Sequence, residues 1–368
     1  MKTLRLLGLF LAALMFNICT HSVSAQSAPT VAAPYQLTVF AQAPSGLSAP
    51  DSIAVLDGHV FVGYGDGHDP AGADGKSSQI VEYNMDGSMV RTFTVLGHSD
   101  GLKVDPVTHL LWALQNEDGN ARLVILNPET GERKLFLLGT GPHGGGYDDI
   151  TFRGCQAYIS ASNPANSPNT APAIVSAHFD GNHIELEPVL AGNTDAIDIP
   201  TGATTTLNLQ DPDSMTLDPL GNIVLDSQGD QELIIVSDPG SANQRVLHLP
   251  LTYMTPAGAI SPVEVDDTNF ATSTEGFILF ADKGLNAVYK LTANAFAPGA
   301  AYTAADGGHF VGTLDLSTGL ITPIVTGLSN PGGLVFVNTS KRDRDQEGDR
   351  DRGFGSCRDR DHDFGRGF

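Results

Sequence analysis

The feature that most constrains the fold is a short motif that recurs along the chain. Each copy has a small or acidic opening followed by a short apolar run. Six copies can be aligned: Asp51-Ser52-Ile53-Ala54-Val55, Asp100-Gly101-Leu102-Lys103-Val104, Asp148-Asp149-Ile150-Thr151-Phe152, Asp213-Ser214-Met215-Thr216-Leu217, Thr268-Asn269-Phe270-Ala271-Thr272 and Gly332-Gly333-Leu334-Val335-Phe336. Successive copies begin 49, 48, 65, 55 and 64 residues apart. A repeat of roughly 40–50 residues with several strands is typical of a β-propeller, so we predict an all-β fold of this kind.

The first two repeats each contain four strand-like segments, which is the content of one propeller blade. In the first repeat they lie near 51–56, 59–64, 79–84 and 89–95, and in the second near 100–104, 109–114, 121–127 and 133–138. Tight turns such as Asp57-Gly58 and Asp86-Gly87 separate them. The fourth repeat follows the same plan, with strands expected at 222–227, 232–237 and 244–249.

Closure of the ring is the open point in this prediction. The fifth repeat has strand-like runs at 276–282 and 287–291, an Ala/Gly-rich insertion at 293–308 and a hairpin within 311–325. We expect the last blade to combine residues 332–338 with the N-terminal strand 35–41 and the hairpin at 309–325. Six blades with an incomplete last one is the first prediction, and five blades with a rearranged closure is the alternative.

Both ends of the chain differ from the repeats. Lys2 and Arg5 precede an apolar run from Leu6 to Phe16, and Ser22 to Ala25 forms a small-x-small cleavage site, so residues 1–25 are predicted to be a signal peptide. A lipoprotein anchored at Cys19 is the alternative, but the residues before Cys19 are not small. We predict a flexible leader at 26–34, the propeller at 35–340, a disordered Arg/Asp-rich tail at 341–368, and export to the periplasm or the extracellular space.

The charge of −22 is concentrated in the body of the chain. Residues 341–368 carry eight bases and eight acids, and the predicted signal peptide carries two bases, which leaves 34 acids and 10 bases for the rest. Such a surface repels nucleic acids and anionic membranes. It suits divalent cations, or it serves only to keep an exported protein soluble. Three cysteines exclude a disulfide framework, although a single Cys155–Cys357 bridge remains open.

Four carboxylates are the main candidate site. In a propeller the innermost strands begin at one end of the central axis, and each of four predicted inner strands begins with an aspartate: Asp51, Asp100, Asp148 and Asp213. Converging carboxylates repel one another unless a cation or protons neutralise them, and Ca²⁺ prefers six to eight oxygen ligands. We therefore predict an axial Ca²⁺ site formed by these four residues, with further oxygen donors at Asp149, Ser214 and Asn269. The alternative is that these side chains only cap turns and bind backbone groups.

Loops at the same end of the axis could add to a site. They are expected at 65–78, 161–172, 191–212 and 255–267. The acidic, glycine-rich loop at 65–78 lacks the register of a calcium loop and is interpreted as a flexible connection. His143 precedes three glycines and Asp148, so it is a candidate general base if the site is catalytic. The glycines themselves are interpreted as a tight turn, since no G-x-S-x-G elbow accompanies them.

The turn-and-strand pattern resembles NHL-repeat and gluconolactonase-like (SMP-30-type) six-bladed propellers. The resemblance is carried by Ser99 to Asp105, by Pro212 to Asn222 and by Gly327 to Leu334. It implies an axial divalent metal and lactonase activity, with a Glu in the first blade and Asn residues in the middle blades. Here the corresponding positions read Ala49-Pro50-Asp51-Ser52 and Ser99-Asp100-Gly101, so the acidic character is kept and the Glu and Asn are not.

Two functions follow as expectations. The first is an exported monomeric propeller that binds a small molecule or an extracytoplasmic protein on its loop-rich face, with an axial divalent cation. The second is a metal-dependent hydrolase or lactonase of the gluconolactonase-like type. No P-loop, dinucleotide fingerprint, CxxC pair or HExxH motif indicates another chemistry.

Overall fold

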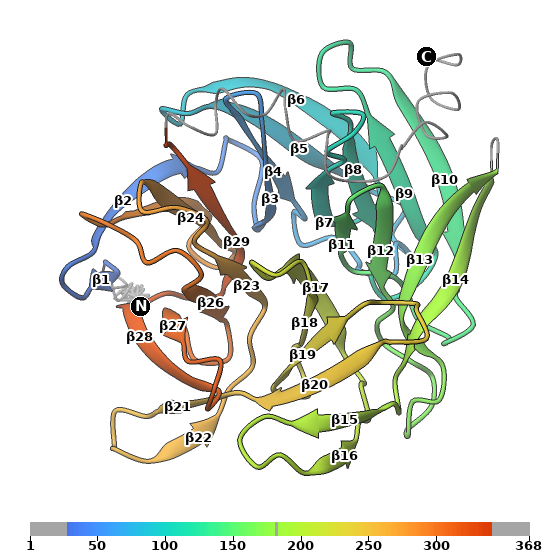
Figure 1. The fold of residues 1–368 in the computed structure, drawn as a ribbon. Helices are drawn as coiled ribbons and strands as arrows, with labels where there is room; N and C mark the ends of the chain where they lie inside the picture. Colours follow the sequence, from blue (N-terminus) through green and yellow to red (C-terminus); the bar gives the residue numbers. More distant parts are fainter. Residues whose placement is uncertain (1–27, 181–182, 341–368) are drawn as a thin grey trace, which may run out of the picture.

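The computed structural model describes residues 28–180 and 183–340. The predicted signal peptide and the Arg/Asp-rich tail lie outside these ranges. Every regular element within them is a β-strand, so the described chain offers no helix able to cross a membrane. The strands hydrogen-bond into six sheets that lie around a common centre (Figure 1). The predicted β-propeller class is confirmed.

The first four sheets follow the sequence repeats. The first contains β3 (Pro50–Leu56), β4 (His59–Tyr64), β5 (Ser77–Asn84) and β6 (Met89–Leu96); the second contains β7 (Ser99–Val104), β8 (Leu111–Gln115), β9 (Ala121–Leu126) and β10 (Arg133–Gly139). The third contains β11 (Ile150–Arg153), β12 (Gln156–Ser160), β13 (Pro172–Asp180) and β14 (His183–Ala191); the fourth contains β17 (Pro212–Leu217), β18 (Ile223–Ser227), β19 (Glu232–Ser237) and β20 (Arg245–Pro250). In each sheet the chain passes from the inner to the outer strand by antiparallel pairing.

The last part of the chain alternates between the fifth and the sixth sheets. The fifth sheet starts with β23 (Asp267–Phe270) and continues with β26 (Ala301–Ala305), β27 (Phe310–Leu314) and β28 (Leu320–Thr326). Between β23 and β26 the chain first makes β24 (Gly276–Asp282) and β25 (Ala287–Thr292), which belong to the sixth sheet. That sheet obtains its inner strand from β29 (Pro331–Asn338) and its outer strand from β2 (Gln36–Gln42).

Our prediction for the closure is therefore corrected in one respect. The N-terminal strand and residues 331–338 do share the last sheet, but the hairpin between them is β24–β25 and not the one at 309–325. The 309–325 hairpin completes the fifth sheet together with β26, which lies inside the segment interpreted as an Ala/Gly-rich insertion. The strand Ala301–Ala305 contains three alanines, which have low strand propensity, but all five of its residues are buried, so packing stabilises it as a strand.

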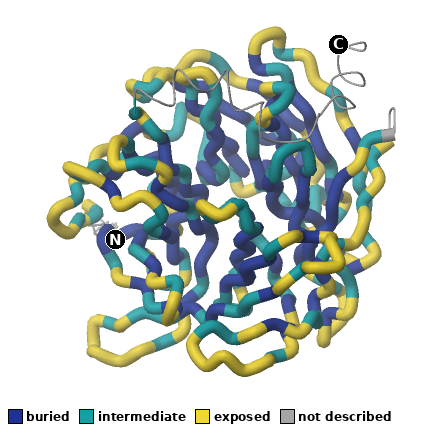
Figure 2. Tube along the Cα trace, viewed as in Figure 1, coloured by how far each residue is buried: buried dark blue, intermediate teal, exposed yellow. Residues whose placement is uncertain are grey.

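The hydrophobic core lies between neighbouring sheets. Six clusters of buried residues are present, and each one combines side chains from two adjacent sheets. Inner strands contact one another in the order β3, β7, β11, β17, β23, β29 and back to β3, so the ring is closed. Figure 2 shows buried residues along the strands and exposed residues mainly in the connections. Trp112, predicted to be core, is fully buried between the edges of Phe152 and Phe179.

Three short additions cover outer edges. β15 (Asp195–Asp198) with β16 (Thr204–Thr206) joins the edge of β20, and β21 (Thr252–Met254) with β22 (Ile260–Pro262) joins the edge of β28. The segment predicted as a loop at 191–212 thus contains a hairpin, and the one at 255–267 contains the second strand of another. Within the predicted flexible leader, β1 (Thr30–Val31) also pairs with β28. Cys155 is disulfide-bonded, and the other cysteines of the chain, Cys19 and Cys357, lie outside the described residues.

Candidate axial site

A β-bulge places each carboxylate of the candidate site. In β3, β7 and β17 the register shifts between the first strand residue and the fourth, and the aspartate is the residue that follows the first. A bulge leaves the extra residue unpaired and turns its side chain out of the regular alternation. Asp51, Asp100 and Asp213 are therefore directed to the end of the axis where the inner strands begin. Asp148 precedes β11 and occupies the corresponding position.

The structure brings the four predicted carboxylates together. Burial raises the pKa of Asp100 well above its ordinary value, and the charges of its neighbours raise it further; these neighbours are Glu117, Asp148, Asp51 and Asp213. Burial and like charges act on Asp148 and Asp213 in the same direction. For Asp51, burial is the main cause of a pKa of about 6. These mutual effects identify one cluster of carboxylates, which we call the axial ring.

The fifth member of the axial ring is Asp266, and our alignment of the fifth repeat was wrong by two residues. The backbone N–H of Asp266 donates to Ala304 O, just as that of Asp148 donates to Ser160 O. Thr268, which we had aligned with the ring, is instead buried and donates its hydroxyl to Asp226. The dipeptide Asp266-Asp267 repeats Asp148-Asp149, and this signal was present in the sequence.

The sixth position of the axial ring is Gly332, which has no side chain to contribute. A Cβ at Gly332 would lie 2.4 Å from Asp266 Oδ2, so the neighbouring carboxylate occupies the space that a side chain would need. The next residue, Gly333, adopts φ 47° and donates its N–H to the same Oδ2 at 3.2 Å. The glycine pair thus allows the sixth inner strand to approach Asp266 closely.

Lys283 supplies the positive charge at this position. It follows β24, the strand next to β29, and its Nζ lies 3.1 Å from Asp51 Oδ2 and 3.2 Å from Asp266 Oδ1. Burial alone would lower the pKa of Lys283, but the charges of Asp266, Asp51 and Asp100 outweigh it and raise the pKa well above its ordinary value. The side chain of Lys283 is 28% exposed, so solvent reaches the axial ring.

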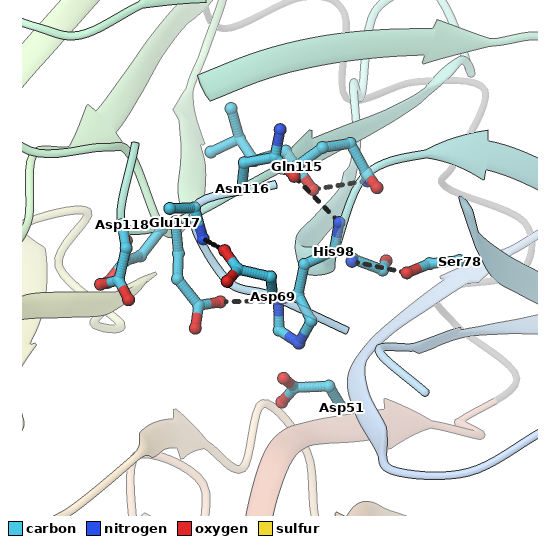
Figure 3. Close-up of polar contacts among 12 residues, drawn as sticks. Asp51, Asp69, Ser78, His98, Gln115, Asn116, Glu117 and Asp118 are labelled. Carbon is cyan, nitrogen blue, oxygen red and sulfur yellow. Dashed lines mark hydrogen bonds and ion pairs between the residues drawn. The ribbon is translucent and has the colours of Figure 1, made fainter. Parts of the chain in front are cut away.

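His98 and Glu117 form an ion pair at the rim of the axial ring, as Figure 3 shows with Asp51 close by. His98 Nδ1 lies 3.2 Å from Glu117 Oε2. Burial opposes charge on both groups, but their hydrogen bond and mutual attraction prevail, so the pKa of His98 is raised and that of Glu117 is lowered. Glu117 also shares a hydrogen bond with Asp100. Because the pKa of Asp100 is raised, we assign the shared proton to Asp100.

A second layer of charges lies further along the inner strands. Lys103 Nζ is 2.9 Å from Asp149 Oδ2, and the same oxygen accepts the N–H of Met215 at 2.8 Å. Asp267 Oδ2 accepts the N–H of Leu334 at 2.6 Å, and burial is the main reason that its pKa is raised to about 8. Asp149 therefore binds a backbone group of the fourth sheet, as expected from the alternative in which these side chains only cap turns and bind backbone groups.

The remaining candidates take part in local contacts, and the loop after β4 lies beside Glu117 and His98 at the rim of the axial ring (Figure 3). Asn269 Oδ1 accepts the N–H of its neighbour Phe270 and, at 3.4 Å, that of Phe336 in the next sheet. His143 packs edge-on against Tyr147, its Nε2 is 2.7 Å from Gly146 O, and burial lowers its pKa. In the loop after β4, Asp69 and Asp74 accept backbone N–H groups of the loop itself. These contacts organise turns.

The arrangement does not fit a divalent cation in the axial ring. Among the residues that the structure describes, no group of three or more His, Cys, Asp and Glu side chains is arranged to hold a metal. The position between Asp51 and Asp266, where two carboxylates face one another, is taken by the ammonium group of Lys283.

Comparison with known proteins finds solved structures that resemble this chain in architecture. No family model and no curated protein matches the chain, so the NHL-repeat resemblance has no matching family. Similar solved structures include virginiamycin B lyase from Staphylococcus aureus, at 12% identity, a TM-score of 0.46 and coverage of 78% of this chain and 87% of that one. Periplasmic gluconolactonase from Pseudomonas aeruginosa has 11% identity, a TM-score of 0.45 and coverage of 79% and 89%. A putative gluconolactonase has 12% identity, a TM-score of 0.44 and coverage of 81% and 83%. These values assign no activity to the chain.

Proposed function

We propose that this chain is a ligand-binding β-propeller whose axial ring recognises a positively charged group, an ammonium or a guanidinium, of a small molecule. The supporting observation is the excess of negative charge at one end of the axis. Five aspartates and Glu117 meet there, and Lys283 and His98 are the cations among them. A ligand that brings a cation would relieve the repulsion that, after burial, contributes to the raised pKa values of Asp51, Asp100, Asp148 and Asp213.

The half of the axial ring opposite Lys283 is the part that would contact the ligand. Within the described residues the carboxylate of Asp213 makes no hydrogen bond or ion pair, and it is partly exposed. Burial is the main cause of its raised pKa, and the charges of Asp266, Asp148 and Asp211 add to it. Asp148 accepts a hydrogen bond from the Ser162 hydroxyl, which leaves its charge unbalanced.

Calorimetric titration tests this proposal, with putrescine and arginine methyl ester as probes and glucose as the neutral control. Binding of a cation should lower the raised aspartate pKa values and release protons, so the measured heat should depend on the ionisation enthalpy of the buffer. Asp213→Asn should weaken binding by about tenfold or more. Asp57→Asn is the matched control, because Asp57 lies in the turn at the opposite end of β3. The proposal is wrong if no cationic probe binds, or if the two variants bind equally well.

A second candidate is the hydrolase or lactonase of the gluconolactonase-like type. The observation that favours it is the chain of hydrogen bonds from His98 through Glu117 to Asp100, which is the kind of arrangement that can hold and move a proton. Hydrolysis of glucono-1,5-lactone in a pH-stat, with calcium and with EDTA, tests this candidate. Activity that is lost in His98→Gln would support it, and a rate equal to the uncatalysed one would remove it.

We also propose that the protein acts as a monomer in the periplasm or outside the cell, with residues 1–25 as its signal for export. The support for export is the sequence pattern alone. Cell fractionation of the full-length protein, with N-terminal sequencing of the mature form, tests the expected start at Gln26. Light scattering of the same sample tests the monomer.

A further inference from the structure

We propose that Lys283 is the built-in cation of the axial ring. Its ammonium group holds the place between Asp51 and Asp266 that a divalent ion would otherwise take, so the protein as built does not bind metal there. This inference is independent of which ligand the Asp213 side of the axial ring binds.

The axial ring departs from six-fold symmetry at one position. Each of the first five sheets contributes one aspartate, in its inner strand or just before it, and the sixth sheet contributes Gly332. Lys283 belongs to the same sixth sheet, immediately after β24, which pairs with β29 next to Gly332. The sixth sheet thus gives the ring a cation in place of a sixth carboxylate. Its neighbours on either side in the ring are the first and the fifth sheets, which carry the two partners of Lys283.

The backbone around Lys283 is fixed, so its side chain starts from a defined point. The N–H of Lys283 donates to Asn330 O at 2.8 Å. The carboxylate of the preceding residue, Asp282, accepts the N–H groups of Leu285, Ser329 and Asn330 at 2.9, 2.8 and 3.1 Å. The turn after β24 is therefore tied to the segment before β29, and from this turn Lys283 extends toward Asp51 and Asp266.

Distances and chemistry explain why an ammonium excludes a metal here. Two of the three N–H donors of Lys283 are directed at Asp51 Oδ2 and Asp266 Oδ1, at 3.1 and 3.2 Å. A Ca²⁺ ion needs its oxygens at about 2.3–2.6 Å and needs six to eight of them. Lysine and a cation therefore compete for the same two carboxylates. Removing the ammonium leaves an oxygen cluster whose like charges favour a divalent ion in its place.

Calcium titration of Lys283→Met and of the wild type tests the inference, by calorimetry and by the melting temperature at slightly alkaline pH. The wild type should show no saturable binding, and neither CaCl₂ nor EDTA should shift its melting temperature. Lys283→Met should melt at lower temperature, recover with CaCl₂, and bind one Ca²⁺ at least about tenfold more tightly than the wild type. Lys103→Met is the matched control. It removes an axial lysine paired with Asp149 and should lower the melting temperature without creating a calcium site.

Two results would overturn the inference. One is stoichiometric Ca²⁺ binding by the wild type with destabilisation by EDTA. The other is a folded Lys283→Met protein that gains no affinity for Ca²⁺. If Lys283→Met fails to fold even with CaCl₂, Lys283→Arg, which keeps the positive charge, is compared with the wild type instead. Neither protein should respond to calcium, and a response of either one contradicts the proposal.

Discussion

The most direct test of the electrostatics along the axis is the substitution Asp267→Asn. Asp267 is 5% exposed, and its Oδ2 accepts the N–H of Leu334, a contact that the amide oxygen of asparagine can keep. Burial is the main cause that raises its pKa from 3.8 to about 8, and the charges of Asp149 and Asp266 add to it. The folded protein therefore keeps a proton on Asp267 over a range of pH in which the unfolded chain has lost it.

The sign and the size of the effect follow from this difference. The contribution of Asp267 to stability is complete below pH 3.8, falls as the pH rises, and is lost above about pH 8. A difference of about four pKa units at about 1.4 kcal/mol each gives about 6 kcal/mol. Asparagine carries no such charge. The free energy of unfolding of Asp267→Asn, compared with that of the wild type at the same pH, should therefore rise by up to this amount between pH 4 and pH 9.

Urea unfolding followed by tryptophan fluorescence measures this difference, because Trp112 is the single tryptophan of the chain and is fully buried. The other buried aspartates are present in both proteins, so their contributions cancel apart from their interactions with the charge of Asp267 itself. Asp57→Asn is the control: its side chain is 62% exposed, and its effect should stay within about 0.5 kcal/mol at every pH. A constant difference between Asp267→Asn and the wild type from pH 4 to pH 9 would refute the reasoning.

Three further predictions concern the scaffold. Trp112→Ala should lower the free energy of unfolding by about 3–5 kcal/mol in urea unfolding followed by circular dichroism, and a loss under 1 kcal/mol would contradict the packing of Trp112 between two phenylalanine rings. The hydrogen bond from His248 to Glu232 is the main cause of the raised pKa of His248, so this stabilisation is complete below pH 6.5 and lost as the pH rises through the folded value. His248→Gln should accordingly lower the melting temperature more at pH 6 than at pH 9, and an equal shift would show that the charge is not involved. Deletion of residues 36–42 removes β2 and exposes the edge of β25, so we expect association in light scattering, whereas a monomer of unchanged stability would contradict the role of β2 in closure.

Much of the fold could be predicted from the sequence because its signals are local. Alternating apolar residues, Asp-Gly turns and the repeated aspartate give nearly all strands of the first, second and fourth sheets. The pairing of the last two sheets could not be predicted in the same way. β24–β25 and the 309–325 hairpin are equally good local hairpins, and only long-range packing decides which of them joins β29.

The residues of the candidate site also divide into those that the sequence predicts and those that it does not. Four ring aspartates were identified because they open a periodic motif, and Asp266 was missed because Thr268 gave a better apolar run. Glu117 and Lys283 belong to no motif. Each lies just after the second strand of its sheet, at the end where the inner strand begins, so topology rather than sequence pattern brings them to the axis. A search of the positions after each second strand would have found both.

The alternation of the chain between the last two sheets has a consequence for how the molecule can be made. As the polypeptide is synthesised from N- to C-terminus, β23 is made well before its partner β26, and β24 and β25 are made well before β29, the inner strand of their sheet. The fifth sheet can therefore be completed only when the sixth is nearly complete. β2 waits for β25 across almost the whole domain. The final quarter of the chain therefore has to assemble as one event rather than sheet by sheet, and contacts of such long range slow folding. A premature stop between β23 and β28 would therefore leave two sheets open at once, although it removes less than a quarter of the described strands.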